Sequence, residues 1–428
     1  MKRVLLRAAV VVAVAAVFVA GIIILLRGWS DPRLEGYKRT LRAKGEKLLV
    51  SELLSSPPGL TNLLIPRLVA ANRQFGPGPP TFELMQIGAD GRAMPAWKKT
   101  NEWLAMHKQV DLAEGALIAM RDALRTPERD LGWDQTNWST FPSSALIELR
   151  ATSHRLSAAI VIELNRGRQE EALSYLIALL NLADCFEEEG TLVFQMIRVA
   201  LSGVGFAATW EALQASGWSD EQLARLQAAW REVKLLPTLE FALEMERARG
   251  LDYFEIAHGR PSNDPGLTQP FDSVGEAMYA PIWKVALASG DELTFLQTMQ
   301  HFLDALRAAR QKSSGAELQK RLVAMPKRGW FAEYRYPMAQ ALIPNLQKAL
   351  IRAIKGEVER QLALTAIGLE RYRLRYGRYP EKLYELVPEI LAGVPVDFGD
   401  GKPLRYKRVG DNYELWSQWE NTRWPQPQ

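Results

Sequence analysis

The 428-residue sequence predicts a mainly α-helical protein with an N-terminal transmembrane helix, a body of helical hairpins and a small α+β C-terminal module with a β-hairpin. Three observations predict this fold class. Residues 8–26 form an unbroken apolar run. Apolar residues then recur at helical spacing through most of the body, and alternating residues flank the turn signal Gly410–Asp411–Asn412.

The apolar run predicts a membrane anchor. Its 19 residues lie between Arg7 and Arg27, and as a helix they would span roughly 28 Å, about the hydrocarbon thickness of a bilayer. A cleavable signal peptide is the alternative. The small pair Ala20–Gly21 is followed at once by the apolar residues 22–26, so cleavage there would leave an apolar N-terminus. We therefore expect an uncleaved, single-pass anchor.

The orientation of the anchor depends on the basic residues at its two ends. Three precede the run and seven follow it between residues 27 and 47. A count of positive charge alone would place the body in the cytoplasm. A short basic tail before a large C-terminal body is, however, the usual form of a signal anchor with its N-terminus inside. We expect the second arrangement, in a bacterial inner membrane with the body in the periplasm.

The net charge of +4 is unevenly distributed. Residues 1–50 carry ten Lys or Arg and three Asp or Glu, whereas the remainder carries 43 basic and 46 acidic residues. A basic segment next to an apolar span suits contact with anionic lipid headgroups. A nucleic-acid interface would need a basic face on the folded body, so we expect no nucleic-acid partner.

The chain divides into four expected segments. Residues 1–29 form the cytoplasmic tail and anchor, 30–142 juxtamembrane helices with aromatic loops, 143–340 the helical-hairpin body, and 341–428 a long helix with the α+β module. The helices expected in the body are Ser144–Asn165, Gln169–Glu188, Thr191–Ala215, one from the Ser219 N-cap to about Leu235, Thr238–Ala257, Glu276–Ala288 and Asp291–Lys312. Residues 167–175 resemble the second half of a tetratricopeptide repeat, which supports hairpin architecture only.

The C-terminal segment carries the most specific pattern. Apolar residues follow one stripe of a long helix that begins near Met338 or Pro344, and Gly377 is placed to end it. A short helix follows Pro380. The strands around residues 404–408 and 413–417 then flank the hairpin turn.

This segment resembles the globular end of the major pseudopilin of type II secretion systems. The residues that carry the resemblance are Tyr372, Arg373, Gly377, Tyr379, Pro380, Leu386, Val387, Pro395, Asp397, Gly401, Pro403, Leu404 and Tyr406. The resemblance implies a long helix that leads through a short helix into a small antiparallel sheet. The pseudopilin processing site and its terminal calcium loop are both missing. We therefore expect Asp397, Asp400 and Asp411 to serve turn geometry.

The whole chain also resembles large membrane-anchored proteins of planctomycetes and verrucomicrobia to which no activity is assigned. They share an N-terminal span, a segment like Arg42–Glu46, a helical-hairpin region and this ending. The resemblance implies location and architecture.

No catalytic, metal-binding or cofactor-binding residue is expected. The four histidines, His107, His154, His258 and His301, have no metal-ligand spacing, and no nucleotide-binding or nucleophile motif is present. The pairs Glu244/Glu246 and Glu357/Glu359 are two residues apart, so on a helix they point to different faces. The single cysteine, Cys185, is expected to be a buried structural thiol.

Aromatic residues in two loops supply the candidate ligand site. Trp133 and Trp138 lie in one loop and Trp330 in another, with Glu333 and Arg335 beside it. Loop aromatics can form a platform for a carbohydrate or peptide, although they can equally fill gaps between helices.

Two functions fit these features. We expect a membrane-anchored, extracytoplasmic helical scaffold or interaction protein, linked to a secretion or envelope assembly. Its partners would be the lipid bilayer, through residues 8–26, and envelope proteins. The alternative is an envelope-polymer hydrolase, or a carbohydrate- or peptide-binding protein. The hydrolase would need a pocket with two inward carboxylates roughly 5–10 Å apart.

Overall fold

The computed structural model describes residues 30–54, 64–75, 84–87, 92–96, 103–125, 135, 143–258, 281–324, 335–343 and 346–427, with Val14, Val17, Phe18 and Gly21. Within these residues the protein is mainly helical with a few short strands, which confirms the mainly α-helical part of the predicted fold class. The expected anchor, residues 8–26, lies outside the described residues except at those four positions.

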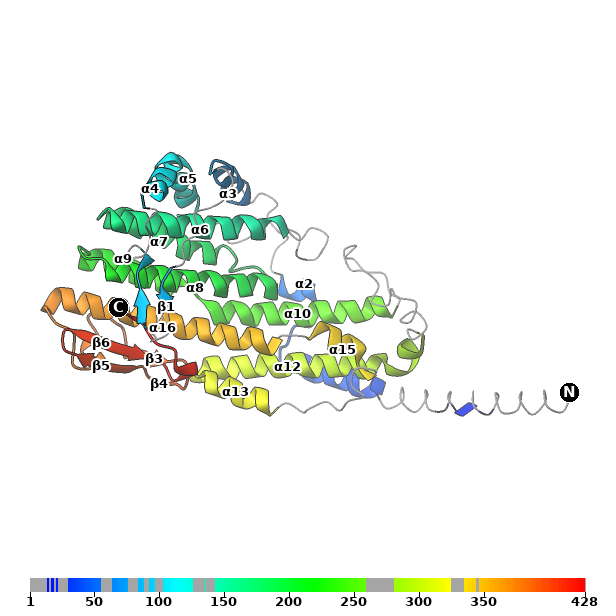
Figure 1. Ribbon diagram of the computed structural model, residues 1–428. Coiled ribbons are helices and arrows are strands. Elements are labelled where there is room, and N and C mark those ends of the chain that lie inside the picture. Colours follow the sequence, from blue (N-terminus) through cyan, green and yellow to red (C-terminus); the bar gives the residue numbers. More distant parts are fainter. Residues whose placement is uncertain are drawn as a thin grey trace, which may run out of the picture.

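Long helices stacked side by side build the body (Figure 1). A helix over residues 30–43 is followed by α2 Val50–Leu53, α3 Leu64–Arg73, α4 Trp103–Leu112, α5 Glu114–Ala123, α6 Ser143–Asn165, α7 Gln169–Asp184, α8 Leu192–Gln214, α9 Asp220–Glu232, α10 Leu235–Ala257, the π-helix η3 Trp283–Leu287, α12 Ala288–Lys312, α13 Gly315–Val323, α15 Pro337–Leu342 and α16 Leu346–Tyr376. The 3₁₀ turns η4 Leu383–Leu386 and η5 Trp419–Asn421 lie in the C-terminal module.

Local signals in the sequence explain the ends of several helices. The Thr191 hydroxyl accepts a hydrogen bond from the Phe194 amide at 3.3 Å and caps α8. Ser219 and Gln222 form the predicted capping box of α9. Gly377 follows the last residue of α16 with φ +72°, the left-handed conformation expected of the residue that ends a helix.

Other bounds differ from the prediction. Helix α7 ends at Asp184 instead of Glu188, and α10 begins at Leu235 instead of Thr238. Helix α13 was not predicted. The predicted start at Glu276 lies outside the described residues, and the chain is π-helical over Trp283–Leu287 before α12 begins.

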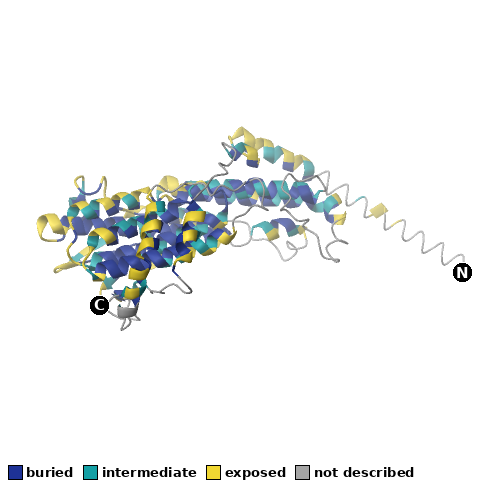
Figure 2. Ribbon diagram, turned by 90° about the horizontal axis from the view of Figure 1, so that it is seen from above, coloured by how far each residue is buried: buried dark blue, intermediate teal, exposed yellow. Residues whose placement is uncertain are grey.

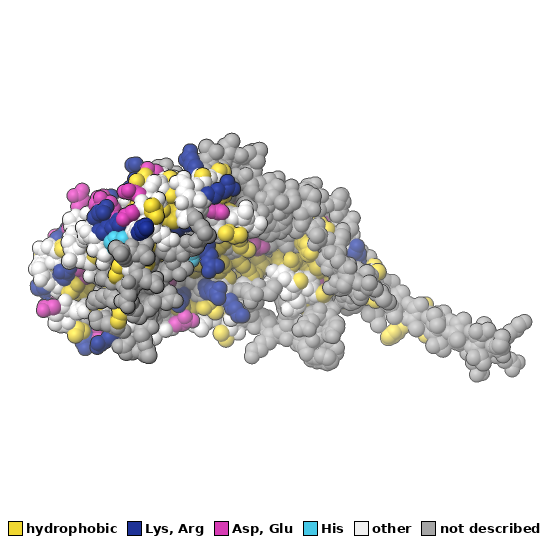
Figure 3. All heavy atoms as spheres, turned by 45° about the horizontal axis from the view of Figure 1, so that its top comes forward, with side chains coloured by type: hydrophobic (Ala, Val, Ile, Leu, Met, Phe, Trp, Pro, Cys, Tyr) yellow, Lys and Arg dark blue, Asp and Glu magenta, His cyan; other side chains and the backbone are white. Residues whose placement is uncertain are grey.

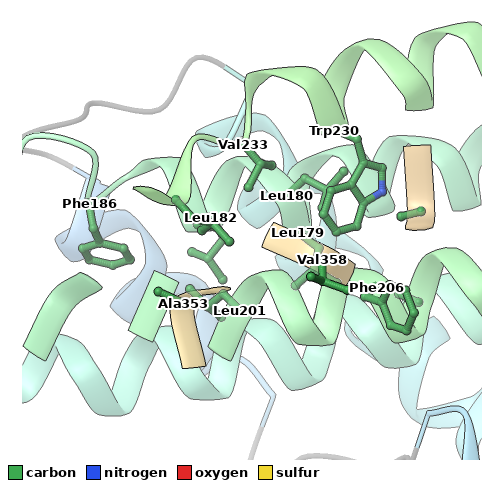
Figure 4. Close-up of a cluster of buried hydrophobic side chains, with 14 of the residues drawn as sticks. Leu179, Leu180, Leu182, Phe186, Leu201, Phe206, Trp230, Val233, Ala353 and Val358 are labelled. Carbon is green, nitrogen blue, oxygen red and sulfur yellow. The ribbon is translucent and has the colours of Figure 1, made fainter. Parts of the chain in front are cut away.

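The main core lies where α7, α8, α9 and α16 meet. Side chains from all four helices fill it (Figure 4), and those labelled there are Leu179, Leu180, Leu182, Phe186, Leu201, Phe206, Trp230, Val233, Ala353 and Val358. The fully buried Trp230 satisfies its indole N–H by donating to the Thr209 hydroxyl at 2.9 Å. Figure 2 shows the buried faces of the long helices turned inward and their exposed residues along the outside. This is the arrangement that helical periodicity predicts.

Close helix packing extends to α10 and α12. At Gly250 on α10, an added Cβ would lie 2.1 Å from Cζ of Phe295 on α12, so only glycine permits this approach. The predicted buried thiol is confirmed: Cys185 is fully buried at the end of α7.

Helix α8 is the one helix, among the described residues, with the length and composition needed to cross a membrane. Its most apolar 18-residue window has a mean hydropathy of 1.5, and half of that window is buried in the protein. A buried core helix has the same properties, and α8 packs against α7 and α16 in the main core.

Short strands join distant parts of the chain. Strands β1 Gln86–Ile87 and β2 Arg92–Met94 are antiparallel, and β2 pairs in parallel with β7 Gln426–Pro427 at the C-terminal end. The Trp210 indole on α8 donates to the Pro425 carbonyl at 2.8 Å. The expected segments 30–142 and 341–428 therefore share one sheet.

Two further strand pairs form the C-terminal module, β3 Val396–Asp397 with β4 Lys402–Pro403, and β5 Arg405–Val409 with β6 Asn412–Trp416. The β5–β6 pair is the predicted hairpin. Gly410, in its turn, has φ +60°. The tyrosines behind the pseudopilin resemblance tie the module together: the Tyr372 hydroxyl donates to Glu385 at 2.9 Å, and the Tyr406 hydroxyl donates to the Pro380 carbonyl at 2.6 Å.

Asp397 organises the loop between β3 and β4. Its fully buried carboxylate accepts hydrogen bonds from the Gly399 amide, the Gln418 amide and the Ser417 hydroxyl, and it pairs with Arg405 at 2.5 Å. Both carboxylate oxygens thus have protein donors. This fits the expected role of Asp397 in turn geometry.

A buried carboxylate holds the β1–β2 segment against α8. Glu211 on α8 is fully buried, and its Oε1 accepts hydrogen bonds from the amides of Met85 at 2.8 Å and Ala96 at 3.0 Å. Burial raises the pKa of Glu211 to about 7, because the two amide hydrogen bonds offset only part of the desolvation cost.

We expect Glu211→Gln to remove a pH dependence of stability. Between the ordinary carboxyl pKa and about 7, folded Glu211 retains a proton that the unfolded chain has released, so stability falls as pH rises through this window. The loss amounts to about 3 kcal/mol at most. Glutamine keeps an acceptor oxygen for both amides and has no charge to bury. Urea unfolding at pH 5 and pH 8 should show the variant gaining stability relative to wild type at pH 8. An equal difference at both pH values would contradict the expectation.

Candidate functional site: a cavity beside the 30–43 helix

A cavity of about 480 Å³ lies between the 30–43 helix, the start of α12 and the segment before α15. This volume is in the range of small-molecule sites. Its lining residues are Ser30, Arg33, Tyr37, Thr40, Ala286, Leu287, Gly290, Leu293, Thr294, Gln297, Arg335 and Tyr336.

The periodicity of the 30–43 helix explains its two faces. Ser30, Arg33, Tyr37 and Thr40 follow each other at intervals of three or four residues, so they form one stripe that lines the cavity. The neighbouring stripe, which contains Leu34 and Leu41, is buried in a cluster with Leu251 and Leu296. Burial of these leucines positions the polar stripe.

Asp291 positions the opposite wall. Its fully buried carboxylate accepts hydrogen bonds from the Trp283 indole at 2.9 Å and from the amides of Met338 at 3.0 Å and Ala339 at 2.9 Å. The amides of Met338 and Ala339 lie in the first turn of α15 and have no acceptor within that helix. Asp291, on α12, therefore caps α15. This contact fixes Arg335 and Tyr336, which precede α15, beside α12.

The cavity is electropositive. Two exposed arginines, Arg33 and Arg335, line it, and none of the described lining residues is a carboxylate. The nearby carboxylate of Glu292 is buried and pairs with Lys38 at 2.6 Å. Burial raises the pKa of Glu292, and the charge of Lys38 opposes this shift.

Hydroxyl groups complete the polar lining. Ser30, Tyr37, Thr40 and Thr294 contribute them, and the Thr294 hydroxyl already donates to the Gly290 carbonyl at 2.7 Å. Among the lining residues that the structure describes, no imidazole, thiol or carboxylate is present to serve as a general base. The arrangement is therefore suited to binding an anionic, hydroxyl-bearing group.

Glu46 binds the chain that follows the 30–43 helix to the body. Its carboxylate pairs with Arg247 on α10 at 2.9 Å and with Arg307 on α12, and it accepts a hydrogen bond from Gln300 at 2.9 Å. Arg247 also donates to the Lys47 carbonyl at 2.8 Å. We call these five residues the Glu46 clamp. The side chain of Arg247 is fully buried and that of Glu46 is 8% exposed.

Arg307 extends the clamp into a network across α10 and α12. It pairs with Glu240 at 2.7 Å and with Glu244 at 2.5 Å. Burial would raise the pKa of Glu46, but the hydrogen bond from Arg307 and the charge of Arg247 outweigh it and hold this pKa below its ordinary value. The carboxylate of Glu46 is therefore ionised at neutral pH.

The structure places one of the five predicted ligand-site residues in the cavity, which is Arg335. Trp133, Trp138, Trp330 and Glu333 lie outside the described residues. The sequence reasoning missed Arg33 and Tyr37. Their signal was the polar stripe at three- and four-residue spacing directly after the apolar run.

The histidines and glutamates discussed next lie outside the cavity lining and make contacts that stabilise the fold. Among the described residues, no cluster of three or more His, Cys, Asp or Glu side chains could hold a metal ion. His258 and His301 each hydrogen-bond a backbone carbonyl, at 2.7 and 2.8 Å. The two-residue glutamate pairs diverge as expected: Glu244 contacts Arg307, whereas Glu246 accepts from the Leu192 amide at 3.0 Å.

A second cavity, of about 370 Å³, lies between α5, α7 and the start of α9. It is lined by Arg121, Asp122, Leu124, Arg125, Ser174, Ile177, Ala178, Asn181 and Arg225. Its arginines are partly neutralised, because Arg121 pairs with Asp122 at 3.0 Å and Arg225 with Glu170 at 2.6 Å. On the face drawn in Figure 3, basic and acidic side chains are likewise interspersed.

Comparison with models of protein families, with curated proteins and with solved structures finds no match to the chain.

Proposed function

We propose that the protein is a membrane-anchored helical scaffold whose body lies in the periplasm and binds partners of an envelope or secretion assembly. The observation that carries the proposal is the Glu46 clamp. It binds the chain, 20 residues after the end of the apolar run, to α10 and α12 inside the body. A scaffold needs such a connection, because its partners must meet it at a defined place above the membrane.

If residues 8–26 are the anchor, the helix over residues 30–43 forms a short, rigid link between the anchor and the body. The helix over residues 30–43 is roughly 21 Å long, and its buried leucines pack on α10 and α12. An enzyme on a flexible tether would need neither the packed helix nor a buried carboxylate after it, since a polar linker is sufficient.

The C-terminal module lies at the far end of this arrangement. In Figure 1, β5 and β6 lie at the opposite end of the body from the start of the 30–43 helix. The module is fixed to the body by α13, whose Gly315 and Ala316 amides donate to the carbonyls of Phe398 at 2.6 Å and Gly399 at 2.9 Å. Its resemblance to a pseudopilin head supports a role in contacts with secretion or envelope proteins.

Crosslinking in cells tests the scaffold. Full-length protein, captured after mild crosslinking, should recover a reproducible set of envelope proteins. The same body released from a cleavable signal peptide should recover far fewer, because its position relative to the membrane is lost. Capture of the full-length chain alone would refute the proposal.

The cavity favours ligand binding as a second function. Arg335 was predicted as part of a ligand site and does line a concave, polar cavity. Within the described part of the chain, neither cavity has two carboxylates in its lining, so binding has more support than polymer hydrolysis, which requires such a pair.

A further inference from the structure

The β5–β6 hairpin of the C-terminal module has two edges, and the β6 edge is covered by the residues that follow it. The Trp424 amide donates to the Leu415 carbonyl at 2.9 Å, and the Gln426 side chain donates to the Tyr413 carbonyl at 2.7 Å. Leu415 and Tyr413 therefore turn their backbone groups away from β5. The C-terminal residues close this edge of the hairpin.

The β5 edge is open. The register pairs Tyr406 with Leu415 and Arg408 with Tyr413, and the two residues of such a pair point their backbone groups in opposite directions. The amides and carbonyls of Tyr406 and Arg408 thus face away from β6. Among the described residues these groups have no hydrogen-bond partner, since β5 pairs with β6 alone. An edge of this kind is a template to which another strand can add.

Exposed valines lie at both ends of the open edge. The Leu404 amide donates to the Pro395 carbonyl at 2.9 Å, which is where β3 meets the start of β5. Val394, one residue before Pro395, is 40% exposed, and Val409 at the other end of β5 is 46% exposed. In Figure 1, β5 lies on the side of the hairpin away from α16. A short strand added there would continue the line of β3 and contact both valines.

The charge of β5 disfavours pairing with a second copy of this chain. Its five residues include Arg405, Lys407 and Arg408 and no acidic residue. Two β5 strands could pair in antiparallel fashion through their outward groups only if the pairing were centred on residue 406, 407 or 408. These arrangements place Arg405 opposite Lys407, Lys407 opposite itself, or Arg408 opposite itself. Like charges directly opposite each other are destabilising.

Lys407 is the charge that remains for a partner of opposite sign. Arg405 and Arg408 both have carboxylate partners within the module. Lys407 is exposed, and among the described residues it forms no ion pair, not even with Glu414 opposite it on β6. An acidic side chain on an added strand would therefore meet a cation that the fold itself does not use.

We propose that the β5 edge binds an extended segment of a partner protein as an additional antiparallel strand. An acidic side chain of this segment lies opposite Lys407, with β-branched residues on either side of it. The inference deepens the proposed function, because it names the surface and the peptide chemistry through which the scaffold binds an envelope partner, and it rests on that function. Backbone hydrogen bonds to Tyr406 and Arg408 supply affinity, and Lys407 selects the partner.

Peptide binding to the full-length protein in neutral detergent tests the proposal. The probe is the capped peptide STVEVTS with a neutral dye, and its fluorescence anisotropy should rise to saturation. STVKVTS should bind about fivefold more weakly, because it places a like charge opposite Lys407. STVEVTS with both valines N-methylated should bind about tenfold more weakly, because the amides that would donate to the carbonyls of Tyr406 and Arg408 are gone.

A charge reversal locates the effect on β5. Lys407→Glu should weaken binding of STVEVTS about fivefold and strengthen binding of STVKVTS by a similar factor. A variant that merely failed to fold would lose both peptides, so the exchange of preference is specific. Lys348→Glu, at an exposed position near the start of α16, is the matched control. It changes the net charge equally and should bind both peptides as wild type does.

Four results would overturn the proposal. Equal affinity for STVEVTS and its N-methylated form would exclude strand addition. An unchanged preference in Lys407→Glu would exclude selection by this lysine. A dimer in light scattering that STVEVTS dissociates would assign the edge to a second copy of the chain. Failure of STVEVTS to bind, while crosslinking of the full-length chain still recovers envelope proteins, would exclude the β5 edge and leave the scaffold function standing.

Discussion

Replacement of Glu46 by alanine should cost about 3–5 kcal/mol of unfolding free energy. The variant leaves the fully buried guanidinium of Arg247 with Gln300 and a backbone carbonyl as its remaining partners in the clamp, and neither of them is charged. The loss of one member of a buried ion pair is more costly than the pair is stabilising, because the other charge remains buried without compensation. Arg307 retains Glu240 and Glu244, so the cost should arise mainly at Arg247.

Denaturant unfolding of the full-length protein in neutral detergent measures this effect. Glu35→Ala is the matched control: Glu35 lies on the 30–43 helix, its side chain is 65% exposed, and its contact with Lys38 is 3.7 Å long. A change below about 0.5 kcal/mol is expected for the control. Equal, small effects of the two substitutions would show that the Glu46 clamp does not hold the 30–43 helix to the body.

Asp397→Ala should destabilise the C-terminal module by about 2–5 kcal/mol. The substitution leaves the amides of Gly399 and Gln418 without their acceptor, and each unsatisfied buried donor costs about 1–3 kcal/mol. Arg405 keeps a second partner in Asp400 at 2.5 Å, which limits the loss.

Hydrogen exchange of the β5–β6 amides, followed residue by residue, would detect this loss even if the helical body stayed folded. Asp411→Asn in the exposed hairpin turn is the control and should leave protection unchanged, since asparagine suits the same turn. Unchanged protection in Asp397→Ala would contradict the central role assigned to this carboxylate.

Helix placement in the body followed from local patterns. The Thr191 and Ser219 caps and Gly377 act within a few residues of themselves, so their physical effect is visible in a short stretch of sequence. The hairpin turn at Gly410 is equally local. Fold class and most helix bounds could be predicted for this reason.

The polar networks could not be predicted, because their members are far apart in the sequence. Arg247 lies 200 residues from Lys47, and Arg307 lies 261 residues from Glu46. The segment Arg42–Glu46 has no local pattern that reveals its role in the clamp, because that role depends on the packing of α10 and α12. Helix α13 escaped prediction for a similar reason, since its first amides find their acceptors in the C-terminal module.

The candidate site was predictable only in part. The aromatic neighbours of Arg335 in the sequence point to a ligand site, but its neighbours in the cavity come from separate segments, among them the 30–43 helix with Arg33. Periodicity indicates which residues of the 30–43 helix share a face. The wall opposite that face is positioned by Asp291. Its carboxylate caps α15, which begins 46 residues later in the sequence, so this contact is not visible in a short stretch of sequence.

The parallel pairing of β7 with β2 has a consequence for biosynthesis. Ribosomes release the chain from its N-terminus, so β1, β2 and α8 emerge long before Pro425 and the two residues of β7. Until those residues emerge, the Trp210 indole lacks its acceptor and one edge of β2 is unpaired. The nascent protein therefore cannot complete its fold until residues 425–427 have emerged, and during that interval the open edge of β2 can pair with other chains.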